Sequence, residues 1–189
     1  MVTEVKEWLQ VVRDEVYRAV QEKLGMEESE RQRQWAQRNM EQIFALEDFK
    51  KIQAAPCNLV LVGCKYDLFE RYDTESRKWL SKALRWLAHE YNMHLVCCSS
   101  RQSILGQQTR SAIHEIISQE APKFTLQKDH LRPVFVPRCQ DSFASIGVAA
   151  QGLKQGMEVL NIKIGSLFET HEQKKKEGTD IAKYPEEKI

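Results

Sequence analysis

The N-terminal part of the chain alternates apolar and polar positions with the period of an amphipathic helix. Apolar residues recur at spacings of three and four, at Val5, Trp8, Leu9, Val12, Val16, Val20 and Leu24. This pattern predicts a helix over residues 2–24 that ends at Gly25, with an apolar face that must pack on another element. Residues 27–55 are rich in charge and glutamine, which predicts a largely exposed helix followed by a connector.

Two short apolar runs predict strands, and an amphipathic segment lies between them. Residues 58–62 and 94–98 have the continuous apolar character of parallel strands that are buried on both faces. Between them, Asp73 or Thr74 is an expected N-cap of a helix that reaches about Tyr91. Its inward positions would be Trp79, Leu80, Ala83, Leu84, Trp86 and Leu87.

The remaining pattern continues the alternation of strand and helix. Residues 107–118 predict a helix whose apolar positions are Ala112, Ile113, Ile116 and Ile117. Residues 133–137 predict a short strand, and its bounding prolines suit the edge of a sheet. Alternating elements of this kind predict an α/β fold in which helices flank a mainly parallel sheet.

Composition and charge argue against nucleic-acid binding, membrane insertion and a disulfide or zinc framework. The 189 residues carry a net charge of +1 with a pI near 7.6, so we expect one domain and no attraction to nucleic acid. The sequence has no apolar run of the roughly 20 residues that span a bilayer, and we expect no membrane insertion. The five cysteines include an adjacent pair but no C-x-x-C, which favours buried, reduced thiols in the cytosol over disulfides or zinc.

The candidate chemistry lies where the first predicted strand ends, at Gly-Cys-Lys-Tyr-Asp, residues 63–67. In the Asn-Lys-x-Asp loop of GTPases, the carboxylate binds the guanine edge and the lysine stem covers the ring. Lys65 and Asp67 match that loop, whereas Cys64 replaces its asparagine and is a weaker hydrogen-bonding group. Ser99 and Ser100 follow the second strand, where a GTPase has a second guanine loop. The alternative, which we favour, is that Lys65 and Asp67 cap a loop or form an ion pair.

The phosphate half of a nucleotide site is missing from the sequence. The spacing G-x-x-x-x-G occurs at Gly147 to Gly152, but the lysine that follows, Lys154, is one place late and no hydroxyl residue comes after it. His89 and His94 are five residues apart, which does not fit a zinc-binding helix. We therefore predict no catalytic residue, no metal ligand and no cofactor, with a vestigial site for GTP or GDP as the alternative. Its residues would be Cys64, Lys65, Asp67, Ser99 and Ser100.

Several segments together resemble the light intermediate chains of the second cytoplasmic dynein, a ciliary motor. The segments are residues 63–69 (G-C-K-Y-D-L-F), 84–91 (L-R-W-L-A-H-E-Y), 132–137 (R-P-V-F-V-P), 141–147 (D-S-F-A-S-I-G) and 180–189. The resemblance implies a Ras-like P-loop NTPase fold of three layers that serves as a platform without catalysis. It also implies the dynein 2 heavy chain and other dynein subunits as partners. The implied locations are the cytoplasm, the cilium with its basal body and axoneme, and the centrosomal cytoskeleton.

The chain departs from that family by beginning at the helix that would follow the fourth strand. We therefore expect residues 1–150 to be the C-terminal portion of a Ras-like domain, and residues 151–189 to be a flexible or partner-bound tail. A sheet that lacks the earlier strands of such a domain would have an uncovered strand edge. We therefore expect the isolated chain to be marginally stable. We expect the rest of the chain to cover residues 27–49 and the tail after Ile164 poorly. We therefore expect these two segments to be the surfaces that bind the heavy chain.

Overall fold

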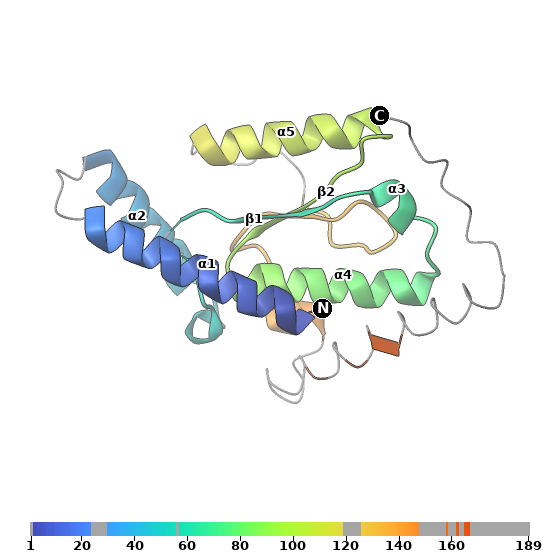
Figure 1. The fold of residues 1–189 in the computed structure, drawn as a ribbon, viewed down its shortest axis with the longest axis horizontal. Coiled ribbons are helices and arrows are strands. Elements are labelled where there is room, and N and C mark those ends of the chain that lie inside the picture. Colours follow the sequence, from blue (N-terminus) through green and yellow to red (C-terminus); the bar gives the residue numbers. More distant parts are fainter. Residues whose placement is uncertain are drawn as a thin grey trace.

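The fold is α/β, with one helix on each face of a small sheet. The computed structural model describes residues 2–23, 30–55, 57–118 and 126–147, and the separate residues Glu158, Ile162, Gly165 and Ser166. Helix α4 (Thr74–Glu90) covers one face of the sheet and α5 (Ser103–Ser118) covers the other (Figure 1). The prediction for the tail, residues 151–189, falls almost wholly outside the described residues.

The sheet has three strands in the order β1, β2, β3. Strand β1 (Val60–Gly63) pairs in parallel with β2 (His94–Cys97), and β3 (Phe135–Val136) pairs antiparallel with β2. The sheet is therefore mixed, and the prediction of a mainly parallel sheet is wrong on this point. A strand of two residues between prolines carries no local signal of its direction, although its place at the sheet edge is as predicted.

Strand position decides burial. The central strand β2 is buried along its whole length, as predicted, whereas every residue of β1 is half-buried. The expectation that β1 is buried on both faces is wrong because, among the described residues, β1 has a neighbouring strand on one side alone.

Helix α4 forms the centre of the core. Asp73 is its N-cap, as expected, and accepts a 2.9 Å hydrogen bond from the backbone amide of Ser76. Trp86 is fully buried and its ring lies 4.6 Å from that of Phe143. The predicted inward face is confirmed, because Ala83, Trp86 and Leu87 are buried while Trp79, Leu80 and Leu84 are half-buried against them.

Other helices differ from the prediction in where they begin or in which of their residues are buried. Helix α5 begins at Ser103, before the predicted start, and of its apolar residues Ala112 is buried while Ile117 is 75% exposed and Ile113 is also exposed. Two short helices that the pattern did not predict are α3 (Tyr66–Phe69) and α6 (Phe143–Ile146). Each is a single turn, too short to produce a periodic signal.

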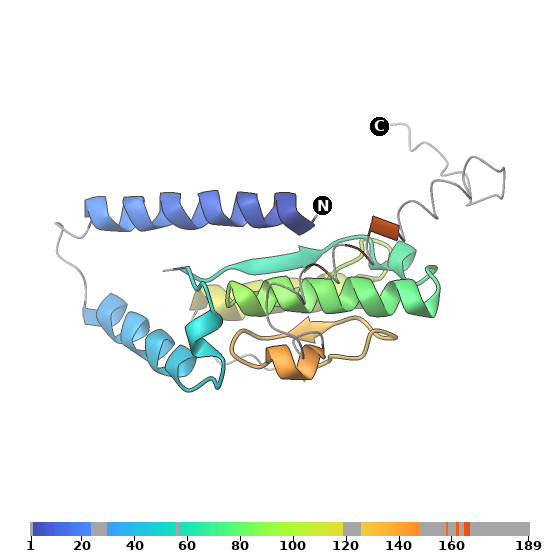
Figure 2. The same cartoon turned by 90° about the horizontal axis from the view of Figure 1, so that it is seen from below.

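The two N-terminal helices, α1 (Val2–Lys23) and α2 (Glu30–Phe44), lie at the side of this core. Figure 2 shows α1 on the side of β1 that faces away from β3. Its outline matches the prediction, but Trp8, placed on the inward stripe by the sequence, is 71% exposed. The contacts of α1 with the core include an ion pair of 2.7 Å from Lys6 to the buried Glu90.

A separate polar contact attaches α2 to Arg138, just after β3. The Arg138 guanidinium donates hydrogen bonds to the side-chain oxygens of Asn39 and Gln42. A short 3₁₀ turn, η1 (Phe49–Lys51), then leads toward β1.

Candidate functional site

The carboxyl ends of β1 and β2 form the floor of the candidate site. The amide of Cys98 donates to the carbonyl of Gly63 at 2.8 Å, and the amide of Tyr66 donates back to the carbonyl of Cys98 at 3.0 Å. These two bonds carry the pairing of the strands into the loops that follow them. The loops that hold Lys65 and Ser99 are thereby brought together, as parallel strands require.

Lys65 holds a backbone conformation that sets the direction of α3. It has φ 58° and ψ 43°, in the left-handed region, and stands at the N-cap of the helix. Its carbonyl accepts a bond of 2.9 Å from the amide of Leu68. The sharp turn places Asp67 in the first helical turn, while the side chains of Cys64 and Lys65 are exposed.

The Asp67 carboxylate already has partners within the chain. The Ser99 hydroxyl donates to Oδ1 at 2.6 Å, and the Arg101 guanidinium lies 3.8 Å from Oδ2. Ser99 is fully buried and also accepts a bond from the amide of Arg101, while Ser100 is exposed. A guanine base would have to compete with these contacts for the carboxylate. The nucleotide-binding role of Cys64, Lys65, Asp67, Ser99 and Ser100 stays a prediction.

The cysteines occupy more varied environments than the sequence suggests. Cys97 is buried in β2, and burial raises the pKa of its thiol to about 11. Cys64 is exposed, which contradicts the expectation of buried thiols, because it lies in the loop after β1 and not within a strand. Cys57, Cys98 and Cys139 are half-buried. In the described part of the chain, all five are free thiols and no cluster of side chains fits a metal ion.

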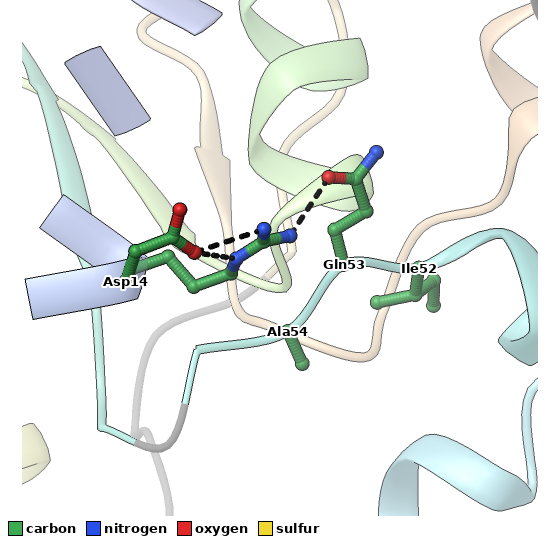
Figure 3. Close-up of a pocket in the computed structure, with 5 residues that line it drawn as sticks. Asp14, Ile52, Gln53 and Ala54 are labelled. Carbon is green, nitrogen blue, oxygen red and sulfur yellow. Dashed lines mark hydrogen bonds and ion pairs between the residues drawn. The ribbon is translucent and has the colours of Figure 1, made fainter. Parts of the chain in front are cut away.

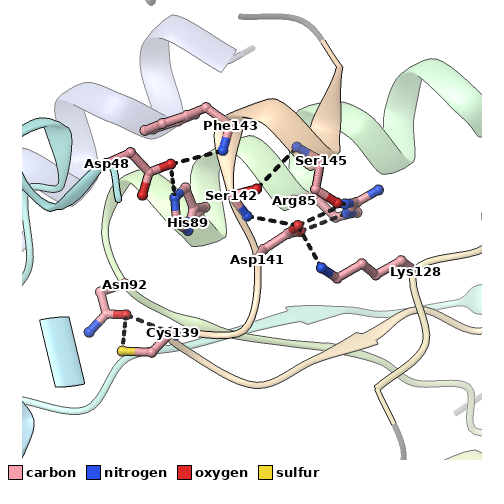
Figure 4. Close-up of polar contacts among 10 residues, drawn as sticks. All are labelled: Asp48, Arg85, His89, Asn92, Lys128, Cys139, Asp141, Ser142, Phe143 and Ser145. Atoms are coloured by element: carbon pink, nitrogen blue, oxygen red, sulfur yellow. Dashed lines mark hydrogen bonds and ion pairs between the residues drawn. The ribbon is translucent and has the colours of Figure 1, made fainter. Parts of the chain in front are cut away.

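A second polar cluster, at the C-terminal half of α4, was not predicted from residue chemistry. Asp141 lies between Arg85 and Lys128 (Figure 4), with bonds of 2.7 and 2.8 Å from the Arg85 guanidinium and a contact of 3.0 Å from Lys128. Burial would raise the pKa of Asp141, but the hydrogen bonds and charges of Arg85 and Lys128 outweigh it and lower that pKa. The cluster fixes the segment before α6 against α4.

The same segment is held at a second point. His89 Nε2 lies 2.8 Å from Asp48 Oδ2, and the amide of Phe143 donates to that same oxygen at 3.0 Å. Asp48 follows α2, so this carboxylate joins three stretches of the chain (Figure 4). Each of these side chains has a polar partner within the chain, although the second carboxylate oxygen of Asp48, Oδ1, is buried and makes no hydrogen bond among the described residues.

An open depression of about 520 Å³ lies between α1 and the connector before β1 (Figure 3). Among the described residues that line it, Arg13 is the cationic one, and its guanidinium bonds Asp14 at 3.0 Å and the Gln53 side chain at 3.0 Å. These contacts engage the guanidinium, so the described part of the lining leaves no unpaired cation for an anion. Among the described residues, no helix combines the length and apolarity that a membrane crossing requires.

Curated proteins with similar sequences all carry one name. The chain is 36% identical over 101 residues to cytoplasmic dynein 2 light intermediate chain 1 of zebrafish. It is 32% identical over 100 residues to the human protein and 31% identical over 130 residues to the bovine one. The chain is homologous to the dynein light intermediate chains. This confirms the family resemblance that the sequence motifs predict.

The homology with dynein light intermediate chains is partial in both directions. The matches cover 53% of this chain and 28% of the zebrafish and human proteins, and 66% of this chain and 36% of the bovine protein. The chain therefore spans about a third of the length of the relatives it matches. A scan of protein-family models gives no match.

Proposed function

We propose that this chain is a structural, non-catalytic subunit of the ciliary dynein motor. It would bind the dynein 2 heavy chain and support retrograde intraflagellar transport and cilium assembly. The observation that carries the proposal is the identity of 31–36% to chains named as light intermediate chains of cytoplasmic dynein 2. We place it in the cytoplasm and in the cilium, at the basal body and axoneme, and with the centrosomal cytoskeleton.

A partial Ras-like fold would serve as the platform for this role. The parallel pairing of β1 with β2, flanked by α4 and α5, supports that part of the proposal. Asp67 is engaged by Ser99 within the chain, which favours a scaffold over a nucleotide switch.

The surface proposed for the heavy chain is α2 with the tail after Ile164. Helix α2 is largely polar where its side chains are described, but Met40 is 49% exposed and Phe44 is 57% exposed, one turn apart. Exposed apolar pairs on a polar helix are frequent anchors of protein interfaces. Residues 27–49 and 165–189 would therefore make the contact.

Co-purification with the dynein 2 heavy chain tests this surface. Replacing Met40 and Phe44 with aspartate should reduce recovery of the heavy chain at least about fivefold, a loss of roughly 1 kcal/mol of binding energy. The matched control is Ile117→Asp, which places the same charge at an exposed apolar position of α5. Recovery of the heavy chain after deletion of both residues 27–49 and 165–189 would contradict the assignment of the surface.

The alternative function is guanine-nucleotide binding, with Lys65 over the ring and Asp67 on its edge. It is favoured by the exposure of Lys65 and by the place of both residues just after β1, the strand that pairs in parallel with β2. Titration with a fluorescent GDP separates the two functions. Micromolar binding that Asp67→Asn abolishes would support the alternative, and no binding at millimolar nucleotide would support the scaffold.

A further inference from the structure

A small, partly enclosed pocket lies behind the loop that follows β1. Its volume is about 90 Å³, and it lies between α3, α4 and the ends of β1 and β2. The walls include Gly63, Tyr66, Leu84, Leu95 and Cys97. Cys64 of the same loop also lines it, although the Cys64 side chain is exposed.

One wall of the space carries a polar group without a partner. Ser81, in the middle of α4, is 3% exposed, and its hydroxyl makes no hydrogen bond within the described residues. A serine inside a helix usually bonds the carbonyl four residues earlier, so an unused hydroxyl is uncommon. Leaving such a group unsatisfied is unfavourable, and a molecule that hydrogen-bonds it would recover that free energy.

The remaining walls restrict what can bind. Every described side chain that lines the pocket is uncharged. Burial raises the pKa of Cys97 to about 11 and also raises the pKa of Tyr66, so both are neutral at pH 7. A charged ligand would lose its hydration without gaining a partner. Water is a poor occupant of these largely apolar walls, because each water molecule needs two to four polar partners.

We propose that this cavity binds a small neutral alcohol or carbonyl compound of roughly three to five non-hydrogen atoms. Its apolar body lies against Leu84 and Leu95, and its oxygen hydrogen-bonds the Ser81 hydroxyl. Occupancy stabilises the junction of β1 and α3, because Gly63 and Tyr66 of that junction form part of the wall.

Titration of the full chain with 1-propanol, followed by amide NMR, tests the proposal. Saturable shifts are expected at the amides of Gly63 and Leu95. Ser81→Ala should weaken 1-propanol about fivefold or more, the equivalent of one hydrogen bond, while xenon, which forms none, binds as in the wild type. Ser100→Ala, at an exposed serine, is the matched control and leaves 1-propanol affinity unchanged.

A second variant tests the cavity itself. Cys97→Leu enlarges a wall side chain and should abolish both xenon and 1-propanol binding. The proposal is overturned if 1-propanol gives no saturable shifts, if Ser81→Ala binds it as well as the wild type does, or if Cys97→Leu still binds xenon.

Discussion

The buried hydroxyl of Ser99 donates a 2.6 Å hydrogen bond to the carboxylate of Asp67, across the ends of two parallel strands. The two residues are 32 positions apart and belong to the two loops that a GTPase would use to hold guanine. Here they bind each other. The contact joins α3 to the loop after β2, and so it gives these two residues of the candidate site a structural role.

Removal of that hydroxyl should lower the stability of the fold. Ser99→Ala leaves a half-buried carboxylate with the distant Arg101 as its remaining charged partner, and hydrogen bonds to charged groups contribute about 1.5–3 kcal/mol. We expect a loss of about 1–2 kcal/mol in the free energy of unfolding, measured with urea. Ser100→Ala, one residue away and exposed, should change it by less than about 0.5 kcal/mol. Equal effects of the two substitutions would show that the bond contributes nothing.

The Arg85–Asp141 pair should be a larger determinant of stability. Both side chains are buried and share two hydrogen bonds, so Arg85→Met leaves a buried carboxylate whose remaining cationic partner is Lys128. Breaking a buried pair in this way costs about 3–5 kcal/mol. Urea unfolding should show a much smaller loss for the double variant Arg85→Met, Asp141→Leu, which removes both charges.

A matched surface substitution controls for the charge alone. Arg101→Met removes an arginine that is half exposed and 3.8 Å from its carboxylate, and should change the free energy of unfolding by less than about 1 kcal/mol. If Arg85→Met were as mild as Arg101→Met, the buried pair would not hold the segment before α6.

The elements that the sequence predicts well are those set by local signals. The spacing of Leu80, Ala83 and Leu87 and the N-cap at Asp73 determine α4. Both signals are local, because the apolar period and the capping bond each involve residues only one or two helical turns apart. The proximity of Asp67 and Ser99 also follows, since each comes just after a strand and parallel strands end at the same edge. Their hydrogen bond does not follow, because it depends on the left-handed turn at Lys65.

The structural features that the sequence does not predict depend on residues that are distant along the chain. Arg85 and Asp141 are 56 positions apart, and no periodic pattern connects them. The half-burial of β1 depends on how many strands lie beside it, which its own residues cannot encode. Likewise Ile117 has the apolar character of a core residue, but the position of α5 on the sheet leaves it in solvent.

Thiol chemistry should distinguish the cysteines by their burial. Cys64 is exposed, while the thiol of Cys97 is buried with a pKa near 11. At pH 8 only about a thousandth of Cys97 would be the reactive thiolate. Iodoacetamide labelling of the native chain, followed by peptide mass spectrometry, should modify Cys64 first and Cys97 last. Cys64→Ser should remove the fastest phase, whereas Cys139→Ser should leave it, and early labelling of Cys97 would contradict this environment.

The buried His94 should make stability depend on pH in the mildly acidic range. Burial, aided by the charge of Arg138, lowers the pKa of His94 from 6.5 to about 4. Between those values the unfolded chain binds a proton that the folded chain does not, so stability is complete above about pH 6.5 and falls as the pH falls toward 4. Linkage gives a loss of about 2 kcal/mol between pH 7.5 and pH 5, measurable by urea unfolding at each pH.

The control for His94 is a less buried histidine, His130. His94→Gln should remove most of this slope, whereas His130→Gln, at a half-buried surface position, should retain it. Asp141 does not interfere, because its lowered pKa makes its stabilisation complete above the ordinary carboxyl pKa, with loss only as the pH falls below that value. A slope in the His94→Gln variant equal to that of the wild type would mean that another group titrates, and that His94 is not held neutral by burial.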